Sequence, residues 1–131
     1  MSWDRPTAAA ALVEVLSGAT AALTPPPSCF TSPPSSFNPP ALVVYLPTIV
    51  TKHIPAFGID RIQLVVLVAA GTSEADLVDQ LLGLATDAIQ ADKSLGGAVQ
   101  LCNPDEWRNW RILTVAGADL MAADLALTLH M

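Results

Sequence analysis

Apolar and polar positions follow two different periods along the chain, and the longest periodic stretch lies between residues 59 and 95. Residues 59–69, IDRIQLVVLVA, alternate at first and then become continuously apolar. This pattern predicts a strand that is covered on both faces at its far end. Residues 73–91 repeat apolar side chains every three to four positions, which predicts an amphipathic helix packed on a core. One strand leading into one helix is therefore the predicted centre of the domain.

Both ends of the predicted helix carry recognisable signals. The hydroxyl of Thr72 or Ser73 can accept a hydrogen bond from the first free amides, and Asp76 suits the positive end of the helix dipole. Gly96 and Gly97 are predicted to stop the helix, because a left-handed residue after the last turn is least strained as glycine.

Shorter patterns predict the elements that precede this unit. Residues 5–17 indicate a first helix that ends at Gly18. Residues 24–40, TPPPSCFTSPPSSFNPP, are too rich in proline for a helix or a central strand, so we expect an extended surface segment in which 29–31 could form a short edge strand. Residues 41–46 predict a strand. Residues 47–58 predict a loop, either a hairpin connection or a partner contact.

The C-terminal third predicts two strands that pair with each other. Residues 98–102 are a short apolar piece, and 103–106, Asn-Pro-Asp-Glu, indicate a turn. Residues 107–115 alternate as a strand does. After a break at Gly117, residues 119–130 keep a period of two, which predicts a final strand antiparallel to the one before it.

These elements predict an α+β fold, with residues 1–131 forming a single small domain. We expect a mostly antiparallel or mixed β-sheet of about four or five strands with two helices packed on it.

The chain has 131 residues and a net charge of −6, and its few basic residues are scattered, which disfavours tight binding to nucleic acid. Its apolar runs are too short to span a bilayer, so we expect no membrane contact.

The candidate chemistry is sparse. Cys29 and Cys102 are isolated and are expected to be buried free thiols. With His53 and His130 they do not show metal-ligand spacing, so no metal site is predicted. Residues 70–73, Ala-Gly-Thr-Ser, could bind an anion at a helix N-terminus but lack the glycines and lysine of nucleotide loops. No catalytic residue and no cofactor are predicted, and we do not expect an enzyme.

Two tryptophans and two arginines lie close together in the strand at 107–115. Trp107 and Trp110, with Arg108 and Arg111, could form a platform for an aromatic ligand. In a continuous strand the two indoles would point to opposite faces, which favours one in the core and the other in a subunit contact.

One short run gives the sequence a family likeness. Residues 95–99, Leu-Gly-Gly-Ala-Val, follow an acid-rich helix, and Gly117 precedes the last strand. In this signature and in the order of its elements, the chain resembles the tail terminator (tail completion) proteins of long-tailed bacteriophages, especially those of actinobacterial phages. The resemblance extends over most of the chain from about Pro6. It departs at 24–40, which have no counterpart, and at Leu120, where the family has tyrosine.

The resemblance implies a structural virion protein of the head–tail neck. Such proteins form a ring, usually of six subunits, that caps the finished tail tube and joins it to the head-side connector or stopper protein. The implied partners are other copies of the chain, the tail tube protein and that connector, and DNA only passes through the lumen. Assembly would take place in the host cytoplasm.

The residues are compatible with a ring. A ring needs complementary patches but no active site. An acidic protomer also suits a lumen through which DNA slides, because adhesion would require lysine and arginine on phosphates. An acidic helix face could line the lumen or simply be solvated, and consists of Asp76, Asp79 and Asp87. The expected subunit or partner contacts are Phe37, Lys52, His53, Phe57, Trp107, Arg108, Trp110 and Arg111.

Three other readings remain open. A head-completion or stopper protein occupies the same neck and has a similar size. A small α/β ligand-binding protein would use the turn at 70–73. An adaptor would use the proline-rich segment 24–40 to grip a partner.

Overall fold

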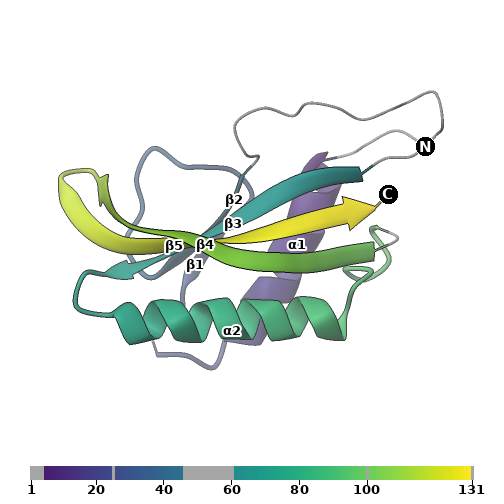
Figure 1. The fold of residues 1–131 in the computed structure, drawn as a ribbon, viewed down its shortest axis with the longest axis horizontal. Helices are drawn as coiled ribbons and strands as arrows, with labels where there is room; N and C mark the ends of the chain where they lie inside the picture. Colours follow the sequence, from purple (N-terminus) through teal and green to yellow (C-terminus); the bar gives the residue numbers. More distant parts are fainter. Residues whose placement is uncertain (1–4, 25, 46–60, 100, 131) are drawn as a thin grey trace.

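The chain folds as one small α+β domain, as the sequence predicts. The computed structural model describes residues 5–24, 26–45, 61–99 and 101–130, and all statements below concern these residues. Two helices and a five-stranded sheet make up this part of the chain (Figure 1). The elements are α1 (Arg5–Thr20), β1 (Ser28–Phe30), β2 (Ala41–Tyr45), β3 (Arg61–Gly71), α2 (Ala75–Ala91), β4 (Leu101–Val115) and β5 (Ala118–His130).

The five strands form a mixed sheet in the order β1-β2-β3-β5-β4. β1 runs parallel to β2, and the remaining neighbours are antiparallel. The last strand, β5, therefore lies between β3 and β4, with Val66 opposite Leu125 on one side and Trp107 opposite Leu125 on the other. The predicted antiparallel pairing of the last two strands is confirmed. β4 becomes one edge of the sheet.

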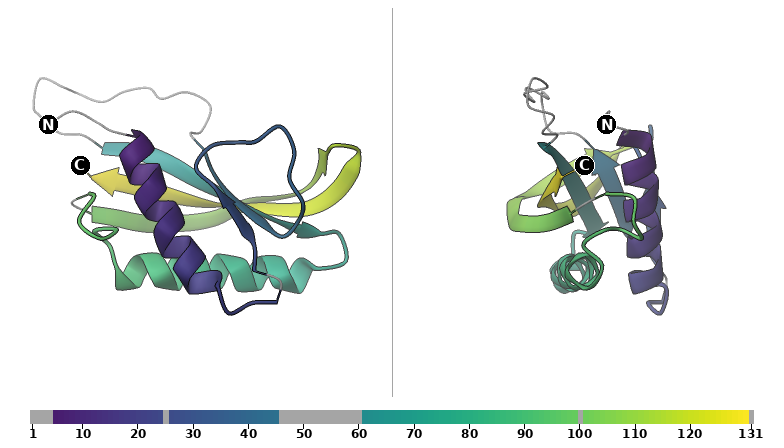
Figure 2. Two further views of the ribbon diagram at one scale, coloured as in Figure 1. Left: turned by 180° about the vertical axis from the view of Figure 1, so that it is seen from behind. Right: turned by 90° about the vertical axis from the view of Figure 1, so that its right-hand side faces the viewer.

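Both helices pack on the same face of the sheet (Figure 2). In α1 the buried side chains recur at helical spacing, at Ala8, Ala9, Leu12 and Leu16, and those of α2 do the same. The buried side chains of both helices pack against the alternate residues of β3 and β5 that point to this face. The largest fully buried side chains of this cluster include Leu64, Leu81, Leu82, Ile89, Leu125, Leu127 and Leu129. None of the described helices is long and apolar enough to cross a membrane.

The opposite face of the sheet carries a smaller apolar cluster. Val43, Leu67 and Ala69 are buried there, and Phe30 and Phe37 pack against them with ring centroids 6.2 Å apart. The proline-rich segment thus supplies side chains that cover this face. β3 is consequently buried on both faces at its far end, as its continuous apolar run predicts.

The signals at the helix ends differ from the sequence-based expectations in three places. α1 continues through Gly18 to Thr20, whose hydroxyl donates to the carbonyl of Leu16 at 2.8 Å. A glycine inside a helix costs only about 1 kcal/mol, which the burial of Leu16 outweighs. The prediction that Gly18 ends the helix is wrong, because packing against the core overrides local propensity.

α2 begins at Ala75 with Glu74 as the cap residue, and no side chain caps its first amides. The hydroxyl cap predicted at Thr72 or Ser73 is wrong, because the turn is closed instead by the amide of Glu74, which donates to the carbonyl of Gly71 at 2.9 Å.

At its other end α2 stops at Ala91, the last residue of the predicted helix, with Asp92 as its cap. The prediction that the glycines stop the helix is wrong, because they lie beyond its end. Leu95, Gly96 and Gly97 have φ of 50°, 71° and 93° and shape the turn that follows. The glycines therefore serve the left-handed turn that leads to β4, where their lack of a side chain removes the steric cost.

β4 is longer than predicted. It starts at Leu101 and runs without a break to Val115, so the turn expected at 103–106 does not exist. Pro104 is tolerated because β4 lies at the edge of the sheet, where a missing amide need not interrupt a central ladder. The pairing with β5 shifts by one residue between Pro104 and Glu106, which is how the strand accommodates the proline.

Candidate interaction surface on the edge strand β4

The outermost strand, β4, carries the large apolar side chains that the fold leaves uncovered. Within the described residues these are Trp107 and Trp110, each 45% exposed, and Ile112, 55% exposed. Because exposed aromatic groups are costly to hydrate and often anchor interfaces, their concentration on one strand marks it as a candidate interaction surface. We call this set the β4 surface.

Trp107 is fixed against the flank of α2. Its Nε1 donates to the hydroxyl oxygen of Thr86 at 2.9 Å, and that hydroxyl donates to the carbonyl of Leu82 at 2.8 Å. Its partner across the ladder is Leu125, which points to the helix-covered face, so Trp107 lies on the same face. The indole is held in one position while nearly half of it stays accessible.

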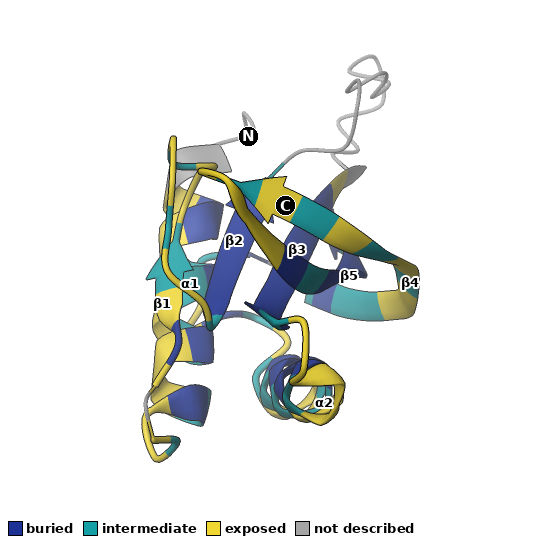
Figure 3. Cartoon of the chain, turned by 90° about the vertical axis from the view of Figure 1, so that its left-hand side faces the viewer, coloured by how far each residue is buried: buried dark blue, intermediate teal, exposed yellow. Residues whose placement is uncertain are grey.

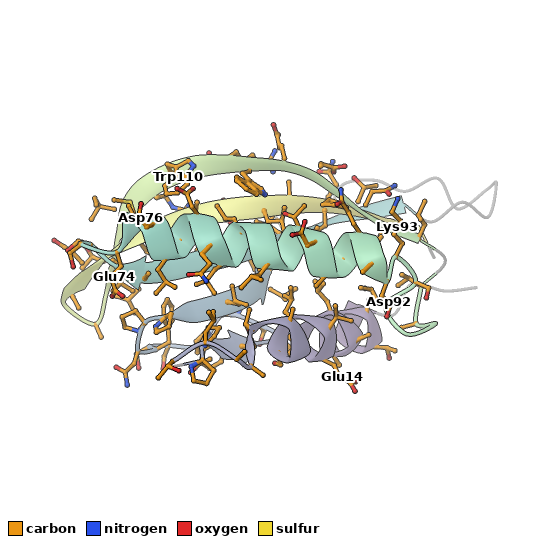
Figure 4. The ribbon with its side chains drawn as sticks, turned by 90° about the horizontal axis from the view of Figure 1, so that it is seen from below. Glu14, Glu74, Asp76, Asp92, Lys93 and Trp110 are labelled. Atoms are coloured by element: carbon orange, nitrogen blue, oxygen red, sulfur yellow. The ribbon has the colours of Figure 1, made fainter. Side chains whose placement is uncertain are left out.

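A bulge in β4 places the second tryptophan. The pairing shifts between Arg108 and Arg111, so that two residues, Asn109 and Trp110, oppose Ala123 alone. Asn109 adopts a left-handed φ of 59°, which asparagine accepts more readily than most residues. The extra residue restores Trp110 to the side of Trp107, and Figure 4 shows it along the β4 edge in the view onto the helices.

The prediction that one tryptophan is core and the other a contact is wrong for this reason. It assumed a continuous strand, in which residues three apart point in opposite directions. The bulge shifts the alternation by one, so neither indole enters the core and both contribute to the exposed surface.

The buried carboxylate of Asp124 holds the bulge in place by a hydrogen bond on the face of the sheet opposite the helices. Asp124 is only 2% exposed, and its Oδ2 accepts hydrogen bonds from Tyr45 Oη at 3.0 Å and Asn109 Nδ2 at 3.1 Å. Arg111 donates to its Oδ1 at 3.3 Å. All these partners satisfy a charge that would otherwise be costly to bury. Burial, reinforced by the nearby charge of Asp124, raises the pKa of Tyr45.

The two arginines of β4 therefore have different tasks. Arg111 is engaged inside the fold by Asp124, so its predicted role as a partner contact is secondary to a structural one. Arg108 is paired at 3.1 Å with Glu106, and both side chains are largely exposed. Such surface pairs stabilise a protein by at most about 1 kcal/mol. The Nε of Arg108 is buried without an acceptor in the described part of the chain. Arg108 thus forms only an exposed ion pair, whereas Arg111 is held by a buried carboxylate.

A groove lies between α1 and the turn that follows α2. It has a volume of about 510 Å³, and its walls include Ala11, Val15 and Leu95 with the carboxylates of Glu14 and Asp92. We call it the α1 groove.

A second hollow of about 290 Å³ lies on the other face, and its lining includes Pro33, Pro34, Phe37, Tyr45 and Arg111. Its wall is mostly apolar, and its one charged group is already paired with Asp124.

The remaining predicted contacts fall in different places. Phe37 is partly buried and packs against the smaller cluster. Lys52, His53 and Phe57 lie outside the described residues. The three acids of the helix face are all exposed on α2, namely Asp76, Asp79 and Asp87.

The turn at residues 70–73 is poorly suited to an anion. The carboxylate of Glu74 folds back over it, with one oxygen 2.7 Å from the position that a Cβ on Gly71 would occupy. A negative group in this place repels the ligand that the turn was expected to bind.

The histidine, cysteine and acidic side chains are the candidates for metal and thiol chemistry. In the described ranges, no three histidine, cysteine or acidic side chains gather as metal ligands would. Cys29 and Cys102 are both free thiols, as predicted, although Cys29 is only partly buried. Burial raises the pKa of both, and that of Cys102 to about 12 with a smaller contribution from Asp105.

Sequence reasoning missed Asp124, Asn109 and the α1 groove. One signal for Asp124 was present, because its neighbours along the strand are apolar on both faces, and such a charge needs internal partners. No protein-family model matches the sequence, and no curated protein matches it either.

Proposed function

We propose that this protein is a structural component of a bacteriophage neck that assembles into a ring, caps the finished tail tube and joins it to the head. The assignment to the neck rests on the resemblance of the chain to tail terminator proteins. The order of helices and strands and the Leu-Gly-Gly-Ala-Val run at residues 95–99 support it. The proposal assigns no catalytic residue and no cofactor.

The β4 surface is the observation that carries the proposal of assembly. A strand of 15 residues at the edge of a sheet, with Trp107, Trp110 and Ile112 exposed, is a liability for a protein that stays monomeric. A contact with another subunit would remove these side chains from water. Self-association therefore accounts for a surface that the fold itself does not need.

The charge distribution suits passage of DNA. The chain has a net charge of −6, and Asp76, Asp79 and Asp87 are exposed along α2. DNA binds proteins chiefly through cations that neutralise its phosphates. A ring that presented this helix to its lumen would repel DNA and let it slide.

Native mass spectrometry and negative-stain electron microscopy of the purified protein test the proposal. We expect closed rings, usually of six subunits in this family, either alone or on addition of the tail tube protein of the same phage. Tubes polymerised in its presence should stop growing and carry a ring at one end. A protein that stays monomeric both alone and with tube protein would rule the ring out.

The same experiment separates the alternative neck protein. A head-completion or stopper protein should bind the head-side connector and leave tube elongation unchanged. Growth of tubes at the same rate with and without the protein, together with connector binding, would replace the terminator by the stopper.

A further inference from the structure

The two faces of the edge strand β4 differ in shape. The β4 surface lies on the helix-covered face of the sheet, because its residues are opposite residues of β5 that pack in or against the main core. Arg111 is opposite Ala122, which belongs to the smaller cluster, so it points to the other face. In Figure 3 the exposed and half-buried stretches of β4 contrast with the buried β2 and β3. One strand therefore exposes aromatic side chains on one face and borders the second hollow on the other.

This second hollow is an apolar depression that the fold leaves open. It has a volume of about 290 Å³ and lies where the proline-rich segment meets β2 and β4, with Pro33, Pro34, Phe37, Tyr45 and Arg111 in its wall. We call it the proline hollow. Phe37 and Tyr45 are only partly buried, and the side chain of Arg111 is 33% exposed. An apolar side chain from a partner would gain burial here.

The chemistry of the proline hollow suits a single aromatic side chain. The charge of Arg111 is balanced by Asp124 at 3.3 Å, so the described wall has no unpaired charge to attract an ionised ligand. Phe37 and Tyr45 offer ring contacts, and a guanidinium group can lie against the face of an indole. The volume of about 290 Å³ is just below the range of about 300 to 1,000 Å³ that is usual for small-molecule pockets.

The chain itself carries a group that fits. The exposed large apolar side chains of the described residues are Trp107, Trp110 and Ile112. Trp107 is held by Thr86, whereas the indole of Trp110 forms no hydrogen bond with the described residues. Trp110 and the proline hollow lie on opposite faces of one sheet, so Trp110 can enter only the hollow of another copy. An exposed apolar group that fits a hollow elsewhere on the same molecule makes a head-to-tail contact, which closes into a ring when the rotation allows.

We propose that Trp110 of one copy inserts into the proline hollow of the next copy. This inference rests on the proposed ring and identifies the surfaces that build it. Each copy gives one indole and receives another, so that both the exposed aromatic group and the open apolar wall are removed from water. A tryptophan in a partner's pocket is the kind of residue that most often dominates the binding energy of an interface.

Two variants test the two sides of the contact. Trp110→Ala removes the inserted group, and Pro34→Arg places a long charged side chain in the hollow. Each should weaken self-association by about thirtyfold or more, measured by sedimentation over a range of protomer concentrations, with tube protein present if the wild type requires it.

Pro26→Arg is the matched control. It makes the same substitution in the same proline-rich segment, at an exposed residue that does not line the hollow. It should leave association unchanged. Circular dichroism and the melting temperature of each variant show whether a loss of association reflects loss of fold.

An equimolar mixture of Trp110→Ala and Pro34→Arg is the sharper test, because a head-to-tail contact uses different residues on its two copies. The first variant keeps its hollow and the second keeps its indole. The mixture should form pairs of one copy each, with an affinity within about threefold of the wild-type contact. The pairs should not grow, because any further contact would involve an altered site. A mixture that shows no recovery would overturn the insertion even if both variants are impaired.

The possible results separate this contact from the ring itself. Wild-type rings that persist unchanged in Trp110→Ala and Pro34→Arg would overturn the contact and leave the ring standing. Open wild-type chains that both variants dissociate, with pairs restored in the mixture, would keep the contact and overturn the closed ring. A wild type that stays monomeric, alone and with tube protein, overturns both.

Discussion

β4 and β5 are neighbouring strands of similar length joined by a tight turn, yet they lie in opposite environments. In β5, residues 122–127 are all buried, because β3 and β4 flank the strand and side chains cover both of its faces. In β4 only Cys102 is buried, and its central residues are exposed. The difference teaches that position in the sheet, more than composition, decides which strand stabilises the fold and which is free to make contacts.

The two strands are also linked by one polar cluster. Asp124 of β5 receives hydrogen bonds from Asn109 and Arg111 of β4 and from Tyr45 of β2. The buried strand thereby holds the bulge that exposes Trp110. The stable part of the molecule determines the shape of the part proposed to bind.

Truncation of β5 should have the largest effect on stability. Leu127→Ala removes a fully buried side chain from the main core and should lower the free energy of unfolding by about 3 kcal/mol, measured by urea denaturation at one fixed protomer concentration. A loss below about 1 kcal/mol would mean that β5 is not the centre of the core.

The link between the strands should come next. Asp124→Asn keeps the shape of the side chain but removes its charge, which leaves Arg111 without an ion pair. We expect the free energy of unfolding to fall by about 2 kcal/mol in the same assay. Asp119→Asn, which alters an exposed carboxylate that accepts from Thr114, is the control and should have a much smaller effect.

The one buried residue of β4 should make stability depend on alkaline pH. The pKa of Cys102 is about 12 in the folded protein against an ordinary value of 9.0, so the unfolded thiol loses its proton first. The stabilisation is complete below pH 9 and is lost as the pH rises from 9 towards 12. The contribution should fall by about 1 kcal/mol between pH 9 and 10.

Cys102→Ala isolates this contribution. Denaturation of the variant at several pH values should show a shallower decline above pH 9. Some slope will persist, because the pKa of Cys29 and of Tyr45 is raised in the same direction. Identical slopes in variant and wild type would contradict the assignment to Cys102.

The exposed side of β4 should contribute least to folding. Ile112→Ala should change the free energy of unfolding of the monomer by no more than about 0.5 kcal/mol, because the side chain is 55% exposed. The same variant should weaken self-association. If it destabilised the monomer as much as Leu127→Ala, β4 would belong to the core and the contrast between the strands would fail.

Much of the fold could be predicted from the sequence because local periodicity and burial agree there. The apolar run of β3, the helical repeat of α2 and the alternation of β5 each indicate one element, and the structure has all three within about two residues of the predicted bounds. In these stretches a single pattern satisfies both backbone hydrogen bonding and core packing, so the local signal suffices.

Only the tertiary structure decided the character of β4. The sequence signals at Pro104 indicate a turn, but an edge position lets the strand continue, and edge position depends on which strands pair. The bulge at Asn109 likewise depends on Asp124, 15 residues away in sequence. The sequence by itself determined the core elements. The arrangement of the strands decided which side chains of β4 are presented to a partner, because exposure depends on neighbours that local pattern does not contain.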